Sequence, residues 1–265
     1  MEIPTFITED ATPCREATNG FERHNINHSS PSSINMWVDC PHAWLAQYLF
    51  NKRSEFGTAA KAGTLVEDAV TNVIARGFTL DAAVASAVEI YNTFAIFDQS
   101  EAAKKRGLAI PGMICLAVGE LSQYGEPEFN EQGKQKKIEL LCNGAGWVLP
   151  IHGYLDYDFP KHNLVVDLKT TMRMPSEMSP SHQRQGAVYK KATGRRVRFL
   201  YTTNKNIETY EVENEMETLG EIKAILNRQE RFLSAGDPAF LKSIVPVVTG
   251  SFYNDKAITK ELFGV

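Results

Sequence analysis

The sequence lacks the features that would assign it at once to a specialised class of protein. Its four cysteines (Cys14, Cys40, Cys115 and Cys142) are widely separated and form no CxxC pair, so their spacing does not indicate a zinc or iron–sulfur site. We expect reduced thiols that are mostly buried. No apolar run of about 18 residues is present, and we therefore expect no membrane-spanning helix. The first ten residues carry three acids and no basic segment before an apolar one, which is not typical of a secretory signal.

Several enzyme motifs are also missing. There is no G-x-x-x-x-G-K-[ST] loop, so we expect no ATP-driven motor in this chain. There is no G-x-S-x-G elbow and no H-E-x-x-H helix, which leaves little support for an unrelated hydrolase. What the sequence does have is ordinary globular composition. Its length of 265 residues allows one large domain or two small ones, and its hydrophobic fraction of 43% is enough to form a substantial core.

The order of the local patterns predicts an α/β protein whose first half is helical. Residues 1–27 are polar and patternless and are expected to form a flexible arm, while residues 236–265 form an extension without an assigned structure. Helices are expected over 34–50 (interrupted at Pro41), 58–76, 80–97, 111–123, 181–193 and 215–234. Strands are expected over 137–142, 147–159, 164–169, 197–203 and 208–212.

The most informative stretch is an expected hairpin that carries two aspartates. Asp167 and Lys169 alternate with apolar residues in a strand, so their side chains point the same way. Asp156 ends the preceding strand, and a short hairpin would bring it beside Asp167. Two carboxylates at such a short distance repel each other unless a cation lies between them. Ligands that are all oxygen suit Mg²⁺ or Mn²⁺. The alternative is a surface hairpin with an ordinary Lys–Asp pair.

Two helices could add to such a site. Glu67 on the early helix could supply a third carboxylate, although Asp68 beside it would serve equally well, and a solvated helix face is the simpler explanation. Gln185 and Tyr189 are four residues apart, so both lie on one face of a later helix, where their polar tips could hold a phosphate or a catalytic side chain.

This ordered set resembles the RecB-like exonuclease branch of the PD-(D/E)XK nuclease superfamily. Members carry G-x-x-x-[HE], G-x-x-D, [DE]-x-K and Q-x-x-x-Y in this order, and the resemblance covers roughly residues 28–203. The segment from His28 to Ile34, followed by Cys40-Pro41, also looks like the start of such proteins. The matching pairs here are Gly63 and Glu67, Gly153 and Asp156, Asp167 and Lys169, and Gln185 and Tyr189.

The resemblance implies a restriction-endonuclease-like three-layer α/β core, a central mixed sheet flanked by helices, with a helical N-terminal elaboration. The single domain would span 28–265, with the helical part at about 28–125 and the catalytic core at about 134–235. One or two Mg²⁺ or Mn²⁺ ions would be bound by Glu67, Asp156, Asp167 and the backbone carbonyl of Leu168. Lys169 would assist the attacking water. Gln185 and Tyr189 would support the active site and the substrate.

The chain departs from its relatives at two places. Many relatives have histidine where this chain has Glu67, and the harder carboxylate favours Mg²⁺. The CRISPR adaptation nucleases and the AddB-type nuclease domains hold an iron–sulfur cluster with one early cysteine and a close C-terminal group of three. Cys40 matches the early position, but no cysteine follows Cys142. We therefore predict no iron–sulfur cluster and a core thiol at Cys40.

The net charge of −4 is an average over two unlike parts. Residues 134–205 contain 13 Lys and Arg against 5 Asp and Glu, whereas the remainder contains 15 against 27. A basic segment beside the expected site favours a DNA backbone as partner, although a solvated helix end would look the same. The predicted DNA-binding residues are His182, Arg184, Lys190, Lys191, Arg195, Arg196 and Arg198.

The resemblance thus predicts a Mg²⁺- or Mn²⁺-dependent deoxyribonuclease, an exonuclease acting on linear DNA ends in recombination, repair or phage DNA metabolism. Its predicted location is the cytoplasm of a bacterial or virus-infected host cell, with no membrane partner. It would act alone, as a homo-oligomer, or with a separate helicase or single-strand annealing protein. The alternative is a catalytically inactive member of the fold that binds DNA ends or scaffolds a helicase–nuclease or recombination complex.

Overall fold

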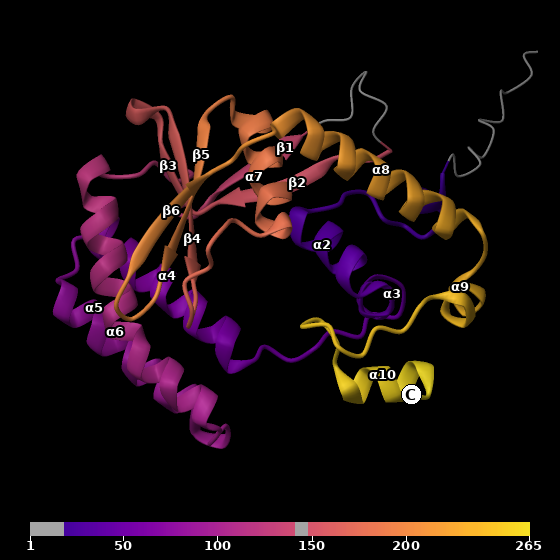
Figure 1. The fold of residues 1–265 in the computed structure, drawn as a ribbon, viewed down its shortest axis with the longest axis horizontal. Coiled ribbons are helices and arrows are strands. Elements are labelled where there is room, and N and C mark those ends of the chain that lie inside the picture. Colours follow the sequence, from indigo (N-terminus) through magenta and orange to yellow (C-terminus); the bar gives the residue numbers. More distant parts are fainter. Residues whose placement is uncertain (1–18, 141–147) are drawn as a thin grey trace, which may run out of the picture.

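The computed structural model describes residues 19–140 and 148–265, which form a mixed α/β structure with helices flanking two sheets (Figure 1). The larger sheet has the order β3-β4-β5-β6, in which β4 and β5 are parallel and the outer neighbours are antiparallel. The smaller sheet pairs β1 with β2 antiparallel. The strands are β1 (Lys136–Leu140), β2 (Ile151–Leu155), β3 (Tyr157–Phe159), β4 (Leu164–Thr170), β5 (Arg196–Thr202) and β6 (Ile207–Glu211).

Helices pack on both faces of the larger sheet, so there is a separate apolar core on each side. One core joins α4, α5 and α6 to the sheet, and the other joins α2, α3, α7 and α8 to the opposite face and to β2 (Figure 1). β4 contributes to both, with Val165 in one core and Val166 in the other. These helices are α2 (Pro31–Asp39), α3 (Pro41–Leu49), α4 (Thr58–Arg76), α5 (Leu80–Phe94), α6 (Glu101–Leu121), α7 (Pro180–Thr193) and α8 (Glu215–Ser234).

The ends of the helices follow from local sequence. Ser30 caps α2 and Ser179 caps α7, each accepting a hydrogen bond from a backbone N–H in the first turn. Gly77 and Gly194 end α4 and α7 in the left-handed conformation, as the sequence predicts. Pro41 opens α3 and thereby separates it from α2, which confirms the predicted interruption.

The prediction for α6 was wrong at its start. The helix begins at Glu101, after Ser100, whose hydroxyl accepts a hydrogen bond from the Ala103 N–H. Pro111 lies inside the helix rather than at its beginning. An interior proline costs about 3 kcal/mol, and the burial of neighbouring side chains such as Ile110 and Ile114 offsets this cost.

The single strand predicted over 147–159 is interrupted. β2 pairs with β1, whereas β3 pairs with β4 in the other sheet, and Asp156 is the residue between them. Residue 147 lies outside the described residues, as does the end of the strand predicted over 137–142.

The described part of the predicted flexible arm is packed against the protein. Helix α1 (Gly20–Arg23) buries Phe21 in a core, and a Cβ on Gly20 would lie 2.5 Å from the Glu230 carbonyl oxygen of α8. Residues 19–27 are therefore no loose arm, because the hydrophobic burial of Phe21 holds them. Residues 1–18 lie outside the described residues.

The C-terminal extension forms α9 (Pro238–Ile244) and α10 (Lys256–Phe263), and a buried histidine fastens it to α3. His42 Nε2 hydrogen-bonds Asn254 Oδ1 at 3.1 Å, and its Nδ1 accepts the Val248 N–H at 3.2 Å. Cys40 is buried beside it, which confirms the predicted core thiol, and burial raises its pKa. Cys115, on α6, is exposed, whereas Cys14 and Cys142 lie outside the described residues, so the expectation of mostly buried thiols stays a prediction.

One helical segment has the length and hydropathy of a membrane span. It covers Leu80–Phe97 with a mean hydropathy of 1.2, and 22% of it is buried. Within it, α5 turns Ala83, Ala87 and Tyr91 into the core shared with α4 and α6. Length and hydropathy alone make this a weak candidate.

Candidate active site

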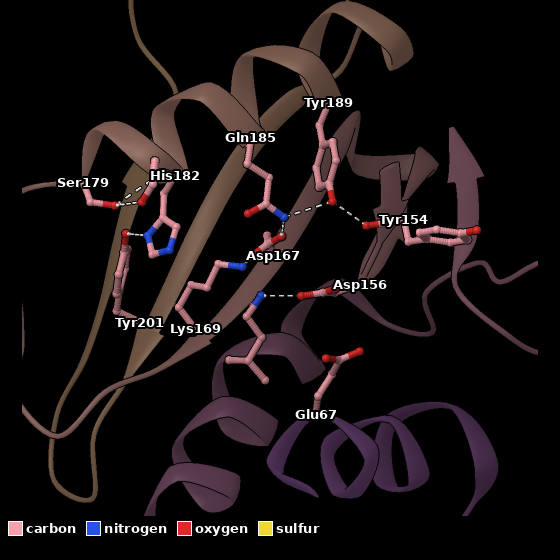
Figure 2. A network of polar contacts seen from close by, with 12 residues as sticks. Glu67, Tyr154, Asp156, Asp167, Lys169, Ser179, His182, Gln185, Tyr189 and Tyr201 are labelled. Carbon is pink, nitrogen blue, oxygen red and sulfur yellow. Dashed lines mark hydrogen bonds and ion pairs between the residues drawn. The ribbon is translucent and has the colours of Figure 1, made fainter. Parts of the chain in front are cut away.

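Asp156 and Asp167 lie close together where β3 begins beside β4 (Figure 2). Tyr157 pairs with Val166 in the antiparallel register, and each aspartate lies one residue beyond that pair. Asp156 Oδ2 also accepts a hydrogen bond from the Leu168 N–H at 3.0 Å (Figure 2). This bond holds Asp156, the residue between β2 and β3, against β4. The expected juxtaposition of the two carboxylates is confirmed.

Asp167 is fully buried and is held from two sides. Its Oδ1 lies 2.5 Å from Lys169 Nζ, and its Oδ2 accepts a hydrogen bond from Gln185 Nε2 at 2.7 Å. Gln185 Nε2 also contacts the Tyr189 hydroxyl, which donates to the Tyr154 carbonyl oxygen at 2.7 Å (Figure 2). Gln185 and Tyr189 of α7 are therefore brought to Asp167 and Lys169 of β4, as predicted.

The glycine of the G-x-x-D segment has a steric reason. A Cβ on Gly153 would lie 2.6 Å from the Tyr189 ring, closer than side-chain atoms approach in real structures. Because Gly153 has no side chain, the Tyr189 ring of α7 can approach the β2 backbone closely and its hydroxyl can reach the Tyr154 carbonyl. This glycine thus sets the distance between α7 and the strand that leads to Asp156.

Glu67 lies on α4, which packs on the face of the larger sheet opposite to α7. Its carboxylate points toward the two aspartates (Figure 2). Its Oε1 accepts a hydrogen bond from Gln135 Nε2 at 2.7 Å, and the same Nε2 lies 2.8 Å from Asp156 Oδ1. The Gln135 amide therefore lies between two carboxylates. Asp68 is exposed on the outer side of the helix, so the structure selects Glu67 of the two alternatives.

Burial raises the pKa values of all three carboxylates, and the charge of Asp167 raises those of the other two further. Burial, followed by the charges of Asp167 and Asp68, raises the pKa of Glu67 to about 7. The pKa of Asp156 is raised by burial and then by the charges of Asp167 and Glu67, and burial raises that of Asp167. Burial lowers the pKa of Lys169, but the charges of Asp167 and Asp156 outweigh it and the net pKa is raised.

The donor set fits a hard divalent cation. Three carboxylates face a single ammonium group, and one positive charge cannot neutralise three negative ones. Apart from Lys169, Asp167 Oδ1 has no hydrogen-bond donor among the described residues. Among the described residues, no three Asp, Glu, His or Cys side chains lie close enough together to hold a metal ion as they stand. The Gln135 amide lies between Glu67 and Asp156. The carboxylates that could hold Mg²⁺ or Mn²⁺ are Glu67, Asp156 and Asp167.

Most of the predicted DNA-binding residues are not brought to this site. Arg196 pairs with Leu164, at the opposite end of β4 from Lys169. Arg195 forms an ion pair with the buried Asp158, and Arg198 donates to Glu211 at 2.7 Å. Lys190 and Lys191, in the last turn of α7, lie at this same distant end. α7 carries this basic run along the helix axis away from Gln185, and its role in DNA binding stays a prediction.

Arg184 and His182 are near the site but are not exposed cations. Arg184 is buried and donates to Glu221 Oε1 at 3.1 Å and to Asn35 Oδ1 at 2.8 Å, so its role is to brace α7. His182 Nδ1 is hydrogen-bonded to the Tyr201 hydroxyl. Burial, followed by the charge of Lys169, lowers the pKa of His182 to about 4, and the ring is therefore neutral at pH 7.

Two residues of the site escaped the sequence analysis. Gln135 precedes β1 in a polar turn, and nothing in that turn signals that its amide reaches across to α4. Tyr201 lies beside Lys169 in the parallel register of β4 and β5. Its position in a strand was predictable, and its partnership with His182 was not.

Comparisons with known proteins do not identify a family. No family model matches the chain, and no curated protein sequence matches it significantly. Among solved structures, the chain is similar to the crystal structure of SSO0001, with 17% sequence identity, a TM-score of 0.35, and coverage of 75% of this chain and 91% of that one. A similarity this low carries no inference about fold or function, so the interpretation of the site depends on its own geometry.

Proposed function

We propose that this protein is a metal-dependent nuclease of the PD-(D/E)XK type that hydrolyses phosphodiester bonds in DNA, acting on linear ends. The observation that carries the proposal is the convergence of Glu67, Asp156 and Asp167 on one lysine, with Gln185 fixing the central aspartate. A mixed sheet with helices on both faces agrees with the restriction-endonuclease-like core that we propose for the fold.

Each side chain has a role that its contacts support. Lys169 keeps its ammonium beside Asp167 and exposes a quarter of its side chain, so it can reach a water molecule or a phosphate oxygen. Gln185 holds the Asp167 carboxylate in one orientation, and Tyr189 holds Gln185. A cation bound by the three carboxylates would supply the polarisation of a phosphate oxygen and a more acidic water.

The test compares cleavage by variants that keep the shape of each side chain. Asp167→Asn and Lys169→Met proteins are assayed on end-labelled linear, nicked and circular DNA with Mg²⁺ or Mn²⁺. Asp68→Asn and Lys161→Met, both exposed, are the matched controls. We expect loss of cleavage of about 100-fold or more in the first pair and none in the controls, with circles left intact. Wild-type rates in both site variants would refute the assignment.

One observation favours the alternative of an inactive protein that binds DNA ends. Gln135 already occupies the space between Glu67 and Asp156, and such an amide can replace a cation in a site that has lost its chemistry. The two functions differ in metal binding. A nuclease should be stabilised by Mn²⁺ in a manner reversed by chelation and abolished in Asp156→Ala, whereas an inactive scaffold should show no such effect.

A further inference from the structure

A cavity of about 480 Å³ opens directly beside the carboxylate cluster. Lys169, Gln185 and Tyr189 form one of its walls, and these residues also contact Asp167 or one another in the site. A volume in this range suits a single small ligand rather than a duplex. The cavity and the site therefore share a boundary at the Lys169 ammonium.

The lining of this cavity suits an anion. Among the described residues that line it none is an aspartate or a glutamate, and the hydroxyls of Ser30, Ser32 and Ser181 join Lys169. The larger cavity, of about 550 Å³ at the other end of the sheet, is lined by Arg76 and Lys161 but also by Glu126 and Glu128. Of the two, only the cavity beside Lys169 has a cation and no carboxylate among its described lining residues.

The outer wall of the cavity presents a flat aromatic surface. The rings of His28 and His152 are stacked, with centroids 4.4 Å apart and planes inclined by 20°. Backbone hydrogen bonds place the two rings side by side. The His152 N–H donates to the Ser29 carbonyl at 2.9 Å, and Ser29 forms a parallel bridge with Ile151. Burial, followed by the charge of His152, lowers the pKa of His28, which keeps this exposed ring neutral and able to stack on a base.

We propose that this cavity receives the terminal nucleotide of the DNA strand being cut, with its phosphate toward Lys169 and the serines and its base against the His28–His152 stack. This rests on the proposed nuclease function and deepens it, because a single-nucleotide cavity next to the site explains action at ends. A strand that ends one nucleotide beyond a phosphate at Lys169 would place that last nucleotide in this cavity.

The direct test is binding of a mononucleotide, which requires no cleavage. Deoxyadenosine 5′-monophosphate and 3′-monophosphate, deoxyadenosine and inorganic phosphate are each titrated with Mg²⁺ present, and the thermal unfolding midpoint is recorded. Ser32→Trp fills the cavity from an exposed position, and His28→Ala removes the outer ring. Ser86→Trp and His162→Ala, exposed elsewhere, are the matched controls.

We expect at least one mononucleotide to raise the midpoint of the wild type and both controls. Ser32→Trp should abolish the shift, and His28→Ala should weaken binding about 10-fold, the effect of losing one stacking surface. The proposal is overturned if neither mononucleotide binds, if Ser32→Trp responds like the wild type, or if phosphate alone binds as well as the nucleotide.

The same variants separate this proposal from the nuclease function. If the wild type releases mononucleotides in an Asp167-dependent way, Ser32→Trp should release longer fragments instead. Unchanged products in Ser32→Trp would overturn the cavity proposal and leave the nuclease function standing. Absence of any Asp167-dependent hydrolysis would remove the nuclease function, and the binding assay would still decide whether the cavity takes a nucleotide.

Discussion

The accumulation of negative charge at the site predicts an unusual dependence of stability on pH. Ionising Glu67 in the folded protein is unfavourable because its pKa is raised from 4.5 to about 7. A carboxyl with a raised pKa contributes stability that is complete below 4.5 and is lost as the pH rises through about 7. At 1.36 kcal/mol for each tenfold change in proton affinity, the loss is at most about 3 kcal/mol.

The perturbation is Glu67→Gln, which keeps an acceptor for Gln135 and removes the charge. The free energy of unfolding is measured by urea denaturation in the presence of a chelator, from about pH 4 to about pH 8. We expect the wild type to lose stability relative to the variant over this interval, with a midpoint change on the order of 1 M urea. Glu89→Gln, the same substitution at an exposed position of α5 whose charge does not act on Glu67, should parallel the wild type.

Mn²⁺ provides a second test in the same experiment. Adding Mn²⁺ in place of the chelator should flatten the pH dependence of the wild type, because a bound cation removes the repulsion among the carboxylates. A difference between wild type and Glu67→Gln that stays constant across the pH range would refute the charge argument, whatever the variant's absolute stability.

Further predictions concern the supports of the site. Tyr189→Phe should cost about 1 kcal/mol in urea denaturation, because the Tyr154 carbonyl loses the hydroxyl that donates to it. Arg184→Ala should destabilise the protein by about 1–2 kcal/mol, because the buried Asn35 loses its donor while Glu221 is half exposed. Lys191→Ala, which is exposed, should have no effect on stability. His42→Ala should make α10 more sensitive to trypsin, measured as the rate at which the C-terminal fragment is released, since it removes the hydrogen bonds that hold this segment on α3.

Local rules predicted the central part of the site correctly. The alternation of side chains in a strand and the shortness of the hairpin were enough to place Asp156 beside Asp167. The spacing of four residues in a helix was enough to put Gln185 and Tyr189 on one face, where the structure has them in contact. These inferences succeeded because each depends on a few neighbouring residues.

The errors arose where distant residues decide the outcome. The excess of basic residues in 134–205 suggested free cations. Several of these side chains instead form ion pairs with acids outside that segment, such as Glu211 and Glu221. Asp158, within the segment, pairs with both Lys136 and Arg195. Counting charges along a chain cannot reveal such pairs, since they form only once strands and helices have been brought together.

The position of Asp156 has a mechanical consequence. Leu155 belongs to the core shared with α7, and Tyr157 to the core shared with α4, so the chain passes from one hydrophobic layer to the other at this single residue. Glu67 is anchored in one layer and Gln185 in the other. A small slide between the layers would therefore change the spacing of the acidic groups before either layer lost its packing. Substitutions far from the site, in the interior of either layer, would in this way shift the proposed cation ligands relative to one another while leaving every polar side chain intact.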